Sequence, residues 1–339
     1  MKALVTGGAG YVGSHLCDAL IRRGASVAVL DNLSTGRMSN IEHLLDHPGF
    51  QFIKGSILDS TEMESLIRSA DRVYHLAAAV GVKYICEDPL AGIRTNIVGT
   101  ERVLELAHRY RTRTVIASSS EVYGKSNGQP LQEDSDRVLG PTSINRWSYS
   151  ASKAIDEHIA FAYADAGLPV SIVRYFNSYG PRICESGYGS VVANFTRQAL
   201  SGEPITIHGD GRQTRAFTFV ADTVRGTLMA GDVPEALGQA FNVGSDCEIT
   251  ILELAHLIHE ISGTRSDVVH TPHWTYYGSS YEDTSRRRPD TSKSARVLGF
   301  RAKTPLAEGL RLTVEWCREH YRCALPQTSE HISSLSRAA

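Results

Sequence analysis

The stretch TGGAGYVGSHL, residues 6–16, follows a short apolar run and precedes a helical pattern. Gly7, Gly10 and Gly13 would let the backbone turn tightly, approach a pyrophosphate and pack the helix close to a sheet. A helix that begins here offers free amides and the positive end of its dipole to phosphates. The spacing is GxxGxxG rather than the general GxGxxG. The stretch therefore predicts a phosphate-binding turn between a strand and a helix.

The residue that ends the next predicted strand indicates which dinucleotide would bind. Asp31 lies about 20 residues beyond the turn, where a carboxylate can accept hydrogen bonds from both ribose hydroxyls. The same carboxylate would repel a 2′-phosphate, and Arg37 lies in the following loop rather than at the strand end. A capping aspartate beside an unused turn is the alternative. The pattern favours a site for NAD over one for NADP.

Short apolar segments alternate with helical patterns through the first half of the chain. We expect strands at residues 2–6, 26–30, 50–53, 72–76, 114–118 and 170–175, with helices at 13–23, 60–69, 97–110 and 152–166. This alternation is typical of βαβ units on a parallel sheet. It predicts an α/β protein with a Rossmann-type, doubly wound parallel sheet.

The pattern loosens after about Phe176, where glycines and prolines interrupt it. Helical segments follow at residues 191–201, 223–230, 251–262 and 305–320. We therefore expect an NAD-binding Rossmann domain at residues 1–175. Residues 176–324 would form mainly a smaller α+β lobe for the substrate, with some segments returning to the first domain. Residues 325–339 lack an apolar period and predict a flexible tail.

Composition excludes several classes of protein. The 339 residues include 35 basic and 37 acidic side chains, so no basic excess indicates nucleic acid or an anionic membrane as a partner. The longest apolar runs are too short to span a bilayer, and MKALVTGG is not typical of a secretory signal. Six cysteines without paired spacing predict reduced thiols in a cytoplasmic protein. No histidine or cysteine spacing predicts a metal.

The stretch WSYSASK, residues 147–153, puts a lysine four residues after a tyrosine. A tyrosine ionises near pH ~10, so a neutral solution holds little phenolate. A fixed ammonium nearby favours the phenolate and lowers that pKa. Side chains at i and i+4 are also neighbours on any exposed helix, which gives an alternative without chemistry. If the lysine does act on the phenol, Tyr149 becomes a candidate base and Lys153 its activator.

With the phosphate turn and the YxxxK pair, several motifs in one order resemble the extended short-chain dehydrogenase/reductase family. Within it, the chain is most similar to nucleotide-sugar epimerases, decarboxylases and dehydratases. The motifs are TGGAGYVGSHL (6–16), DNLSTG (31–36), HLAA (75–78), SSSEVYG (118–124), YSASK (149–153), RYFNSYGPR (174–182), GDGRQTRAFTFVADTV (209–224) and RRPDTSKSARVLGF (287–300). The resemblance extends to about Tyr321 and implies NAD as the cofactor and a nucleotide sugar as the substrate.

The resemblance also implies residue roles. Tyr149 would remove a proton from a sugar hydroxyl, Lys153 would also hold the nicotinamide ribose, and Ser119 would bind the same sugar oxygen. The residues implied to bind NAD are Gly7, Gly10, Tyr11, Val12, Gly13, Asp31, Asn32, Ser56, Ile57, Leu76, Ala77, Ala78, Lys83, Asn96, Tyr149 and Lys153. Those implied to bind the substrate are Ser119, Tyr149, Asn177, Arg215 and Arg287. Ser56 departs from the family's usual aspartate, a stronger acceptor for the adenine amino group.

The reaction after the first oxidation is the open question. A sugar 4-ketone can be reduced on its other face, lose carbon dioxide if it is a uronic acid, or lose water. Glu121 follows Ser120 where 4,6-dehydratases carry an Asp-Glu pair, which disfavours dehydration. A Ser-Glu pair there, with QTRAF and RRRPD, is similar to UDP-glucuronate decarboxylases, whereas VGVKYI and RYFN are closer to epimerases. Glu121 is thus either a fourth catalytic residue or a partner for a backbone amide or a nearby arginine.

We rank an NAD-dependent NDP-sugar 4-epimerase first and a UDP-glucuronate decarboxylase second. A dehydratase, or a non-catalytic NAD-binding sensor on the same fold, follows. Apolar stripes on the helices at 97–110 and 152–166 would let two subunits pair in a four-helix bundle, so we also expect a homodimer. A stripe that faces the chain's own sheet would give the same pattern.

Overall fold

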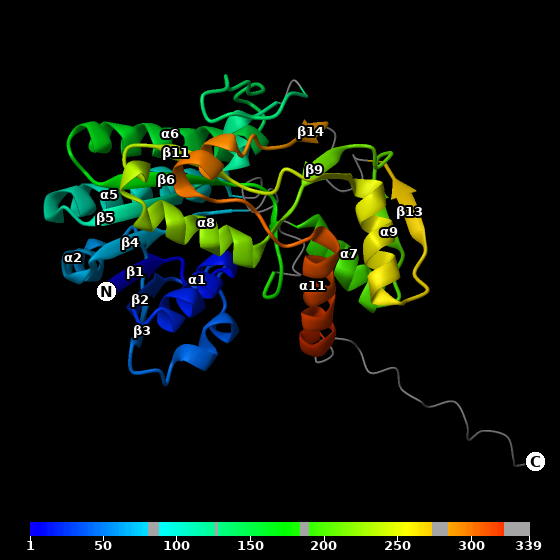
Figure 1. Cartoon of the computed structure of the whole chain (residues 1–339), viewed down its shortest axis with the longest axis horizontal. Coiled ribbons are helices and arrows are strands. Elements are labelled where there is room, and N and C mark those ends of the chain that lie inside the picture. The colour runs from blue at the N-terminus through cyan, green and yellow to red at the C-terminus, as the bar shows by residue number, and fades with distance from the viewer. Residues whose placement is uncertain (81–87, 126–127, 184–189, 273–283, 322–339) are drawn as a thin grey trace, which may run out of the picture.

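The computed structural model describes residues 1–80, 88–125, 128–183, 190–272 and 284–321. Within them, seven parallel strands form one sheet in the order β11-β6-β5-β4-β1-β2-β3 (Figure 1). The strands are β1 (Lys2–Thr6), β2 (Ser26–Asp31), β3 (Phe50–Lys54), β4 (Arg72–His75), β5 (Arg113–Ser119), β6 (Val170–Tyr175) and β11 (Ala240–Val243). The order reverses between β1 and β4, and ligands of such sheets bind at the carboxyl edge beside this reversal.

Helices cover both faces of the sheet because its strands are apolar on both sides. In β1, for example, Leu4 packs into one hydrophobic cluster and Val5 into the other, and both are fully buried. On one face, α1 (Tyr11–Arg22) packs against α8 (Val220–Asp232). On the other face, α5 (Gly99–Tyr110) packs between α2 (Ser60–Ser69) and α6 (Arg146–Asp165). The predicted Rossmann-type fold is confirmed.

Two short segments lead into α5. Helix α4 (Pro89–Ile93) is capped by Asp88, whose side chain accepts a hydrogen bond from the Ala91 amide at 3.1 Å. A π-helical segment, η3 (Arg94–Val98), then joins α4 to α5. The sequence prediction of a helix at 97–110 captured only the last part of this run.

A smaller lobe lies beside the sheet, on the right in Figure 1. Its helices are α7 (Val191–Leu200), α9 (Ile251–Ser262) and α11 (Leu306–Tyr321). Its strand pairs are β8 (Ile205–His208) with β13 (Val268–Thr271), and β9 (Thr214–Ala216) with β12 (Glu248–Thr250) and β14 (Arg286–Arg287). Strands β7 (Ser178–Tyr179) and β10 (Thr218–Phe219) pair near the sheet's edge. Short turns of helix are η1 (Met38–Asn40), η2 (Glu42–Leu44), η4 (Ser120–Tyr123), η5 (Pro234–Ala236) and η6 (Ser294–Leu298).

One predicted helix begins earlier in the structure, and two later elements join the large sheet. Helix α6 begins at Arg146, six residues before the predicted start, so Tyr149 stands on the helix itself. Helix α8 and strand β11 come from beyond residue 176 and join the large sheet, with β11 parallel to β6. The predicted tail at 325–339 lies outside the described residues. In the described part of the chain, no helix is both long and apolar enough to cross a membrane.

Candidate active site

The glycine turn has the shape that a pyrophosphate requires. Gly7 has a φ of +73°, and a Cβ there would lie 2.7 Å from the Ala77 nitrogen. A Cβ on Gly13 would lie 2.1 Å from the Gly7 oxygen. Gly10 precedes α1 and has no side chain with which to cap its first amides. Backbone donors at the start of α1 therefore face a close, unobstructed turn, which fits the phosphates of a dinucleotide.

Asp31 is buried at the end of β2 and is held from two sides. Its Oδ2 accepts from the Ala9 amide at 2.9 Å, and its Oδ1 accepts from the Leu33 amide at 2.8 Å. Burial raises the pKa of this carboxyl, and the two amide hydrogen bonds oppose that rise. The phosphate turn and the carboxylate are thus one rigid unit. Each carboxylate oxygen has further capacity to accept from a ribose hydroxyl.

The other residues implied for NAD lie along the carboxyl edge of the sheet. Leu76, Ala77 and Ala78 directly follow β4, and the Leu76 amide donates to the Thr6 oxygen at 3.0 Å. Ser56 follows β3, and its hydroxyl accepts from the Leu58 amide at 3.1 Å. The rest of this set is Asn32, exposed after β2, Ile57, buried against Gly99, and Tyr11 and Val12 in the first turn of α1. Lys83 lies outside the described residues.

Asn96 is buried under the site rather than open to it. Its Oδ1 accepts from the Ala79 amide at 2.7 Å, and its Nδ2 donates to the Ala79 oxygen and to the Ser152 hydroxyl. These bonds tie the segment after β4 to helix α6. The structure therefore gives Asn96 a role in placing the helix that carries Tyr149, and its predicted contact with NAD stays a prediction.

The predicted catalytic residues meet where β5 and α6 face each other. Ser119 ends β5, and its hydroxyl hydrogen-bonds to the Tyr149 phenol. The ammonium of Lys153 is buried one helical turn beyond the tyrosine, and its charge lowers the pKa of Tyr149. The neighbouring Ser118 donates instead to Glu157. Of the serines in this strand, Ser119 is the one that the structure places on the phenol.

The pKa of Tyr149 departs from the sequence-based expectation. Burial raises this pKa above its ordinary value of 10.0, and Glu121 adds to the rise. Lys153 and the Ser119 hydroxyl oppose it, but they do not outweigh burial in the free protein. The prediction that Lys153 lowers the pKa of Tyr149 is therefore correct in direction. The sequence did not show that burial of the phenol would raise this pKa by more.

Glu121 lies among three arginines, Arg146, Arg215 and Arg287, which we call the arginine cluster. Arg287 donates to Glu121 Oε1 at 2.5 Å, and Arg146 Nη2 lies 3.8 Å from Oε2. Although burial favours the neutral acid, the charges of Arg287, Arg146 and Arg215 lower the pKa of Glu121 below its ordinary 4.5. Glu121 is therefore a carboxylate at neutral pH.

The two arginines predicted to bind substrate are neighbours on paired strands. Arg215 of β9 and Arg287 of β14 are register partners, and both are buried. Arg215 donates to the Thr214 oxygen at 2.7 Å. Asn177, with a φ of +37°, donates to the Ala216 oxygen at 2.8 Å beside them. These groups gather close to Glu121, and their contact with a sugar nucleotide stays a prediction.

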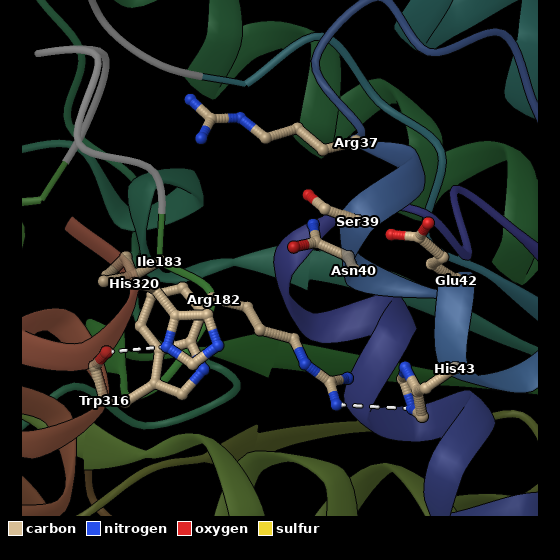
Figure 2. Close-up of a pocket in the computed structure, with 9 residues that line it drawn as sticks. All are labelled: Arg37, Ser39, Asn40, Glu42, His43, Arg182, Ile183, Trp316 and His320. Atoms are coloured by element: carbon tan, nitrogen blue, oxygen red, sulfur yellow. Dashed lines mark hydrogen bonds between the residues drawn. The ribbon is translucent and has the colours of Figure 1, made fainter. Parts of the chain in front are cut away.

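A cavity of about 620 Å³ lies elsewhere, between the loop after β2, residues 182–183 and the end of α11 (Figure 2). Its lining is Arg37, Ser39, Asn40, Glu42, His43, Arg182, Ile183, Trp316 and His320. Arg182 pairs with Asp18 at 2.8 Å, and Trp316 stacks on His320. None of the residues predicted for catalysis lines this cavity, so it is separate from the site around Tyr149.

Comparisons with known proteins agree with this geometry. The family model described as GDP-mannose 4,6 dehydratase matches residues 4–313. The chain belongs to this family. The resemblance to extended short-chain dehydrogenase/reductase enzymes of nucleotide sugars is confirmed.

Individual relatives are also similar to the chain over most of its length. UDP-N-acetyl-alpha-D-glucosaminuronate decarboxylase of Bacillus cytotoxicus is 41% identical over 318 residues, which cover 94% of this chain and 98% of that protein. UDP-glucuronic acid decarboxylase 4 of Arabidopsis thaliana is 38% identical over 337 residues, or 98% and 72% of the two chains. The structure of UDP-glucuronic acid 4-epimerase from Bacillus cereus, in complex with UDP-glucuronic acid and NAD, has a TM-score of 0.84 and 30% identity, covering 94% and 99%.

Arg146 is a residue of the site that was not predicted from the sequence. The residue is buried at the first position of α6, three residues before Tyr149, and its side chain reaches Glu121. Spacing of i and i+3 places two residues on one helix face, so Arg146 could have been found from the sequence if the helix had been predicted to start earlier. The link from Glu121 to Arg287 had no such signal, because the two are 166 residues apart.

Proposed function

We propose that the chain is an NAD-dependent decarboxylase of a UDP-hexuronate. The observation that carries the proposal is the buried ion pair between Glu121 and Arg287 beside the Tyr149 phenol. The sequence ranked the epimerase first, but the 41% and 38% identical relatives are decarboxylases, which favours the alternative. The chain uses NAD, for which the glycine turn and Asp31 have a fitting shape, and NAD supplies hydride acceptance at the sugar's C4 and its later return.

The residues around Tyr149 would begin the reaction. Tyr149 takes the proton of the sugar 4-hydroxyl while hydride leaves C4, so the carbinol becomes a ketone. Lys153 stabilises the phenolate, and the Ser119 hydroxyl donates to the same sugar oxygen as its charge changes. Because burial raises the pKa of the phenol in the free protein, proton removal depends on these two partners and on the charge of the bound cofactor.

The 4-ketone of a uronic acid is a β-keto acid, which determines the next step. The C5–C6 bond breaks, carbon dioxide leaves, and the electron pair of that bond forms an enolate between C5 and the C4 oxygen. Tyr149 and Ser119 would hold this oxygen while C5 takes a proton. Returning the hydride to C4 and the proton to its oxygen completes a pentose, with no net oxidation. NAD is therefore regenerated in each turnover.

In this proposal, Glu121 affects whether an arginine is available to pair with the substrate carboxylate. An arginine free to pair with that carboxylate would stabilise the starting acid and so raise the barrier to loss of carbon dioxide. Here Arg287 already donates to Glu121, and Arg146 lies 3.8 Å from the same carboxylate. The ionised Glu121 thereby competes with the substrate carboxylate for both arginines and weakens their ability to stabilise the uronate before it loses carbon dioxide.

A 4-epimerase of a UDP-uronate is the second candidate, because one observation favours it. The Bacillus cereus neighbour is an epimerase whose structure contains UDP-glucuronic acid and NAD, and its fold matches over 94% of this chain. Both reactions begin with the same oxidation at C4. They differ in whether the C5–C6 bond breaks before hydride returns, and the epimerase must also return the hydride to the other face of C4.

We further propose a homodimer formed through α4, η3 and α6. The apolar stripe of α5, including Val103, Leu104 and Ala107, is buried inside the subunit and faces its own sheet. The exposed apolar side chains lie on the neighbouring segments instead, with Leu90 66% exposed and Ile93, Val98 and Ile155 also exposed. A second copy packed on this face would cover them. Sedimentation of the protein would test it.

The cytoplasm is the proposed location. Among the residues that the structure describes, Cys17 and Cys247 are free thiols, and Cys17 is buried. Secreted proteins of this size commonly pair their cysteines, whereas reducing compartments keep them as thiols.

The decisive experiment incubates the protein with NAD and either UDP-glucuronate or UDP-N-acetylglucosaminuronate in D2O. Products are followed by proton NMR and mass spectrometry. We expect a UDP-pentose that has lost carbon dioxide and gained deuterium at C5, with Tyr149→Phe as the inactive control. A product of unchanged carbon number with an inverted C4 and no deuterium would refute the decarboxylase and support the epimerase.

A further inference from the structure

A second buried ion pair lies directly behind the catalytic tyrosine. Lys153 Nζ lies 3.1 Å from Asp156 Oδ2, and the two side chains are only 4% and 1% exposed. The same ammonium also donates to the Ala117 oxygen of β5 at 3.1 Å. Two of its three protons are therefore directed to fixed acceptors, which sets the direction of the third. Asp156 is the only one of these acceptors that carries a charge.

A chain of hydrogen bonds leads from Ala77, beside the glycine turn, to Thr100. The Ala77 amide donates to Thr6 Oγ1 at 3.3 Å, and Thr6 Oγ1 lies 2.7 Å from His75 Nδ1. His75 Nε2 lies 3.0 Å from Thr100 Oγ1. Burial raises the pKa of Asp156, and Lys153 and the nearby Thr100 oppose that rise, while Asp156 Oδ1 makes no hydrogen bond within the described residues. Burial lowers the pKa of His75 to about 3, so the ring is neutral.

A neutral imidazole donates from one ring nitrogen and accepts at the other, so Thr6 and Thr100 together provide partners for both nitrogens of His75. At Asp156, Oδ2 accepts from Lys153 at 3.1 Å. An asparagine in its place would keep one acceptor oxygen for the lysine, but it would remove the negative charge and add two donors.

We propose that Asp156 is a positioning residue for the reaction, holding the Lys153 ammonium in place and keeping it protonated beside Tyr149. The catalytic part of this inference rests on the proposed function. The physical reason is that a buried ammonium without a nearby anion loses its proton easily. A neutral lysine could no longer stabilise the phenolate. Asp156 and Tyr149 together raise the pKa of Lys153, although burial opposes them.

The other charged groups near Lys153 do not replace Asp156. Glu157, the next residue on α6, accepts two hydrogen bonds from Arg174 and one from Ser118, so Arg174 compensates its charge. Glu121 from η4 is paired with the arginine cluster, and His75 from β4 is neutral. Tyr149 carries its charge only when it has lost its proton. Asp156 is therefore the permanent anion that directly contacts the lysine in the described part of the chain.

The first test measures the protonation of Lys153 and does not depend on turnover. Lysines labelled with 13C at Cε are titrated by NMR in wild type and in Asp156→Asn, and Lys153→Arg assigns the signal. Because the Asp156 charge raises the pKa of Lys153, its removal should lower the pH at which this signal shifts. Asp222→Asn is the control. Asp222, on α8, is a buried aspartate as well, but it pairs with Arg225 rather than with Lys153. An unchanged Lys153 titration in Asp156→Asn would overturn the proposal.

The second test measures the pH dependence of catalysis. Asp156 also raises the pKa of Tyr149, so both limbs of the pH profile of kcat should move to lower pH in Asp156→Asn. We expect kcat above the wild-type optimum to fall about tenfold or more with little change in substrate KM, and Asp156→Glu to restore part of it. A uniform loss at every pH, with no shift, would mean a merely structural role. Absence of decarboxylation in wild type would refute the proposed function and leave the NMR result standing.

A double-mutant cycle covers the case in which Asp156→Asn does not fold. In a Lys153→Met background, Asp156 is a buried carboxylate without its partner. Adding Asp156→Asn should then raise the melting temperature, whereas the same change lowers it when Lys153 is present. If Asp156→Asn lowers the melting temperature equally in both backgrounds, Asp156 does not act through Lys153 and the proposal fails.

Discussion

The change Glu121→Gln tests the ion pair on which the proposed reaction rests. Glutamine keeps the length of the side chain and an oxygen that Arg287 can donate to, but it removes the charge. In wild type that charge meets Arg287 at 2.5 Å and Arg146 at 3.8 Å, in side chains that are 6% and 5% exposed. Removing one member of a buried pair costs about 3–5 kcal/mol, and a retained hydrogen bond reduces this to about 3 kcal/mol.

This free energy corresponds to a measurable change in melting temperature. The entropy of unfolding for 339 residues is roughly 0.7 kcal/mol per kelvin. A loss of about 3 kcal/mol therefore lowers the melting temperature by about 4 °C at pH 7. Calorimetry of the wild type and of Glu121→Gln measures it directly, and Glu315→Gln, an exposed helix carboxylate paired with Arg311, is a control expected to change little.

The pH dependence provides the sharper check. The arginines lower the pKa of Glu121 below its ordinary 4.5, so its contribution to stability is complete above pH 4.5. That contribution is lost as the pH falls through the lowered pKa, because the folded protein then takes up the proton. The melting temperatures of wild type and Glu121→Gln should therefore converge on acidification below pH 4.5. A difference that is absent at neutral pH, or that persists unchanged in acid, would refute the ion-pair reasoning.

Three further predictions concern the site. Tyr149→Phe should abolish turnover, read by mass spectrometry, while NAD binding by fluorescence titration is unchanged; residual turnover near the wild-type rate would overturn the assignment of the base. Gly13→Ala should destabilise the protein by about 1–3 kcal/mol through overpacking and weaken NAD binding, because its Cβ would lie 2.1 Å from the Gly7 oxygen. Gly24→Ala, with open space and a φ of +75°, should lower stability but leave NAD affinity unchanged. Asp31→Asn should reduce the preference for NAD over NADP, measured by competitive titration as the ratio of the two dissociation constants. An unaltered ratio would contradict the role of the carboxylate.

Local patterns predicted most of the large sheet, because each element is encoded within a few residues. The glycine turn is such a case: a Cβ on Gly13 would meet Gly7 and Gly8 of the same strand–turn–helix unit, although Gly7 is also required by the approach of Ala77 from the segment after β4. The start of α6 was less predictable. Asn145 makes no side-chain cap, and the helix is extended to residue 146 by burial of Arg146 and Trp147 against other parts of the chain. Such burial is a tertiary effect that local propensity does not contain.

The sequence predicted which residues form the site, but it predicted less well their pKa shifts and ion pairs. Tyr149, Lys153 and Ser119 follow from motifs, and the structure brings them together. The sequence suggested an acidified phenol, yet the pKa of Tyr149 is raised because burial outweighs the lysine. Burial depends on how β5, η4 and α6 enclose the phenol. For the same reason the sequence left open whether Glu121 is catalytic or pairs with a backbone amide or an arginine, and only the fold brings Arg287 to it.

The charges in the arginine cluster bear on the choice between decarboxylation and epimerisation. Arg146, Arg215 and Arg287 all act on Glu121, so the carboxylate cancels part of their charge and leaves an excess that suits a dianionic diphosphate. A UDP-uronate brings that diphosphate and, in addition, the carboxylate on C6. If the diphosphate takes the remaining positive charge, the C6 carboxylate enters a buried site without a cation to hold it. Losing carbon dioxide removes that uncompensated charge, whereas an epimerase must keep it through a full turnover. The balance of charge around Glu121 thus favours the reaction that discards the carboxylate.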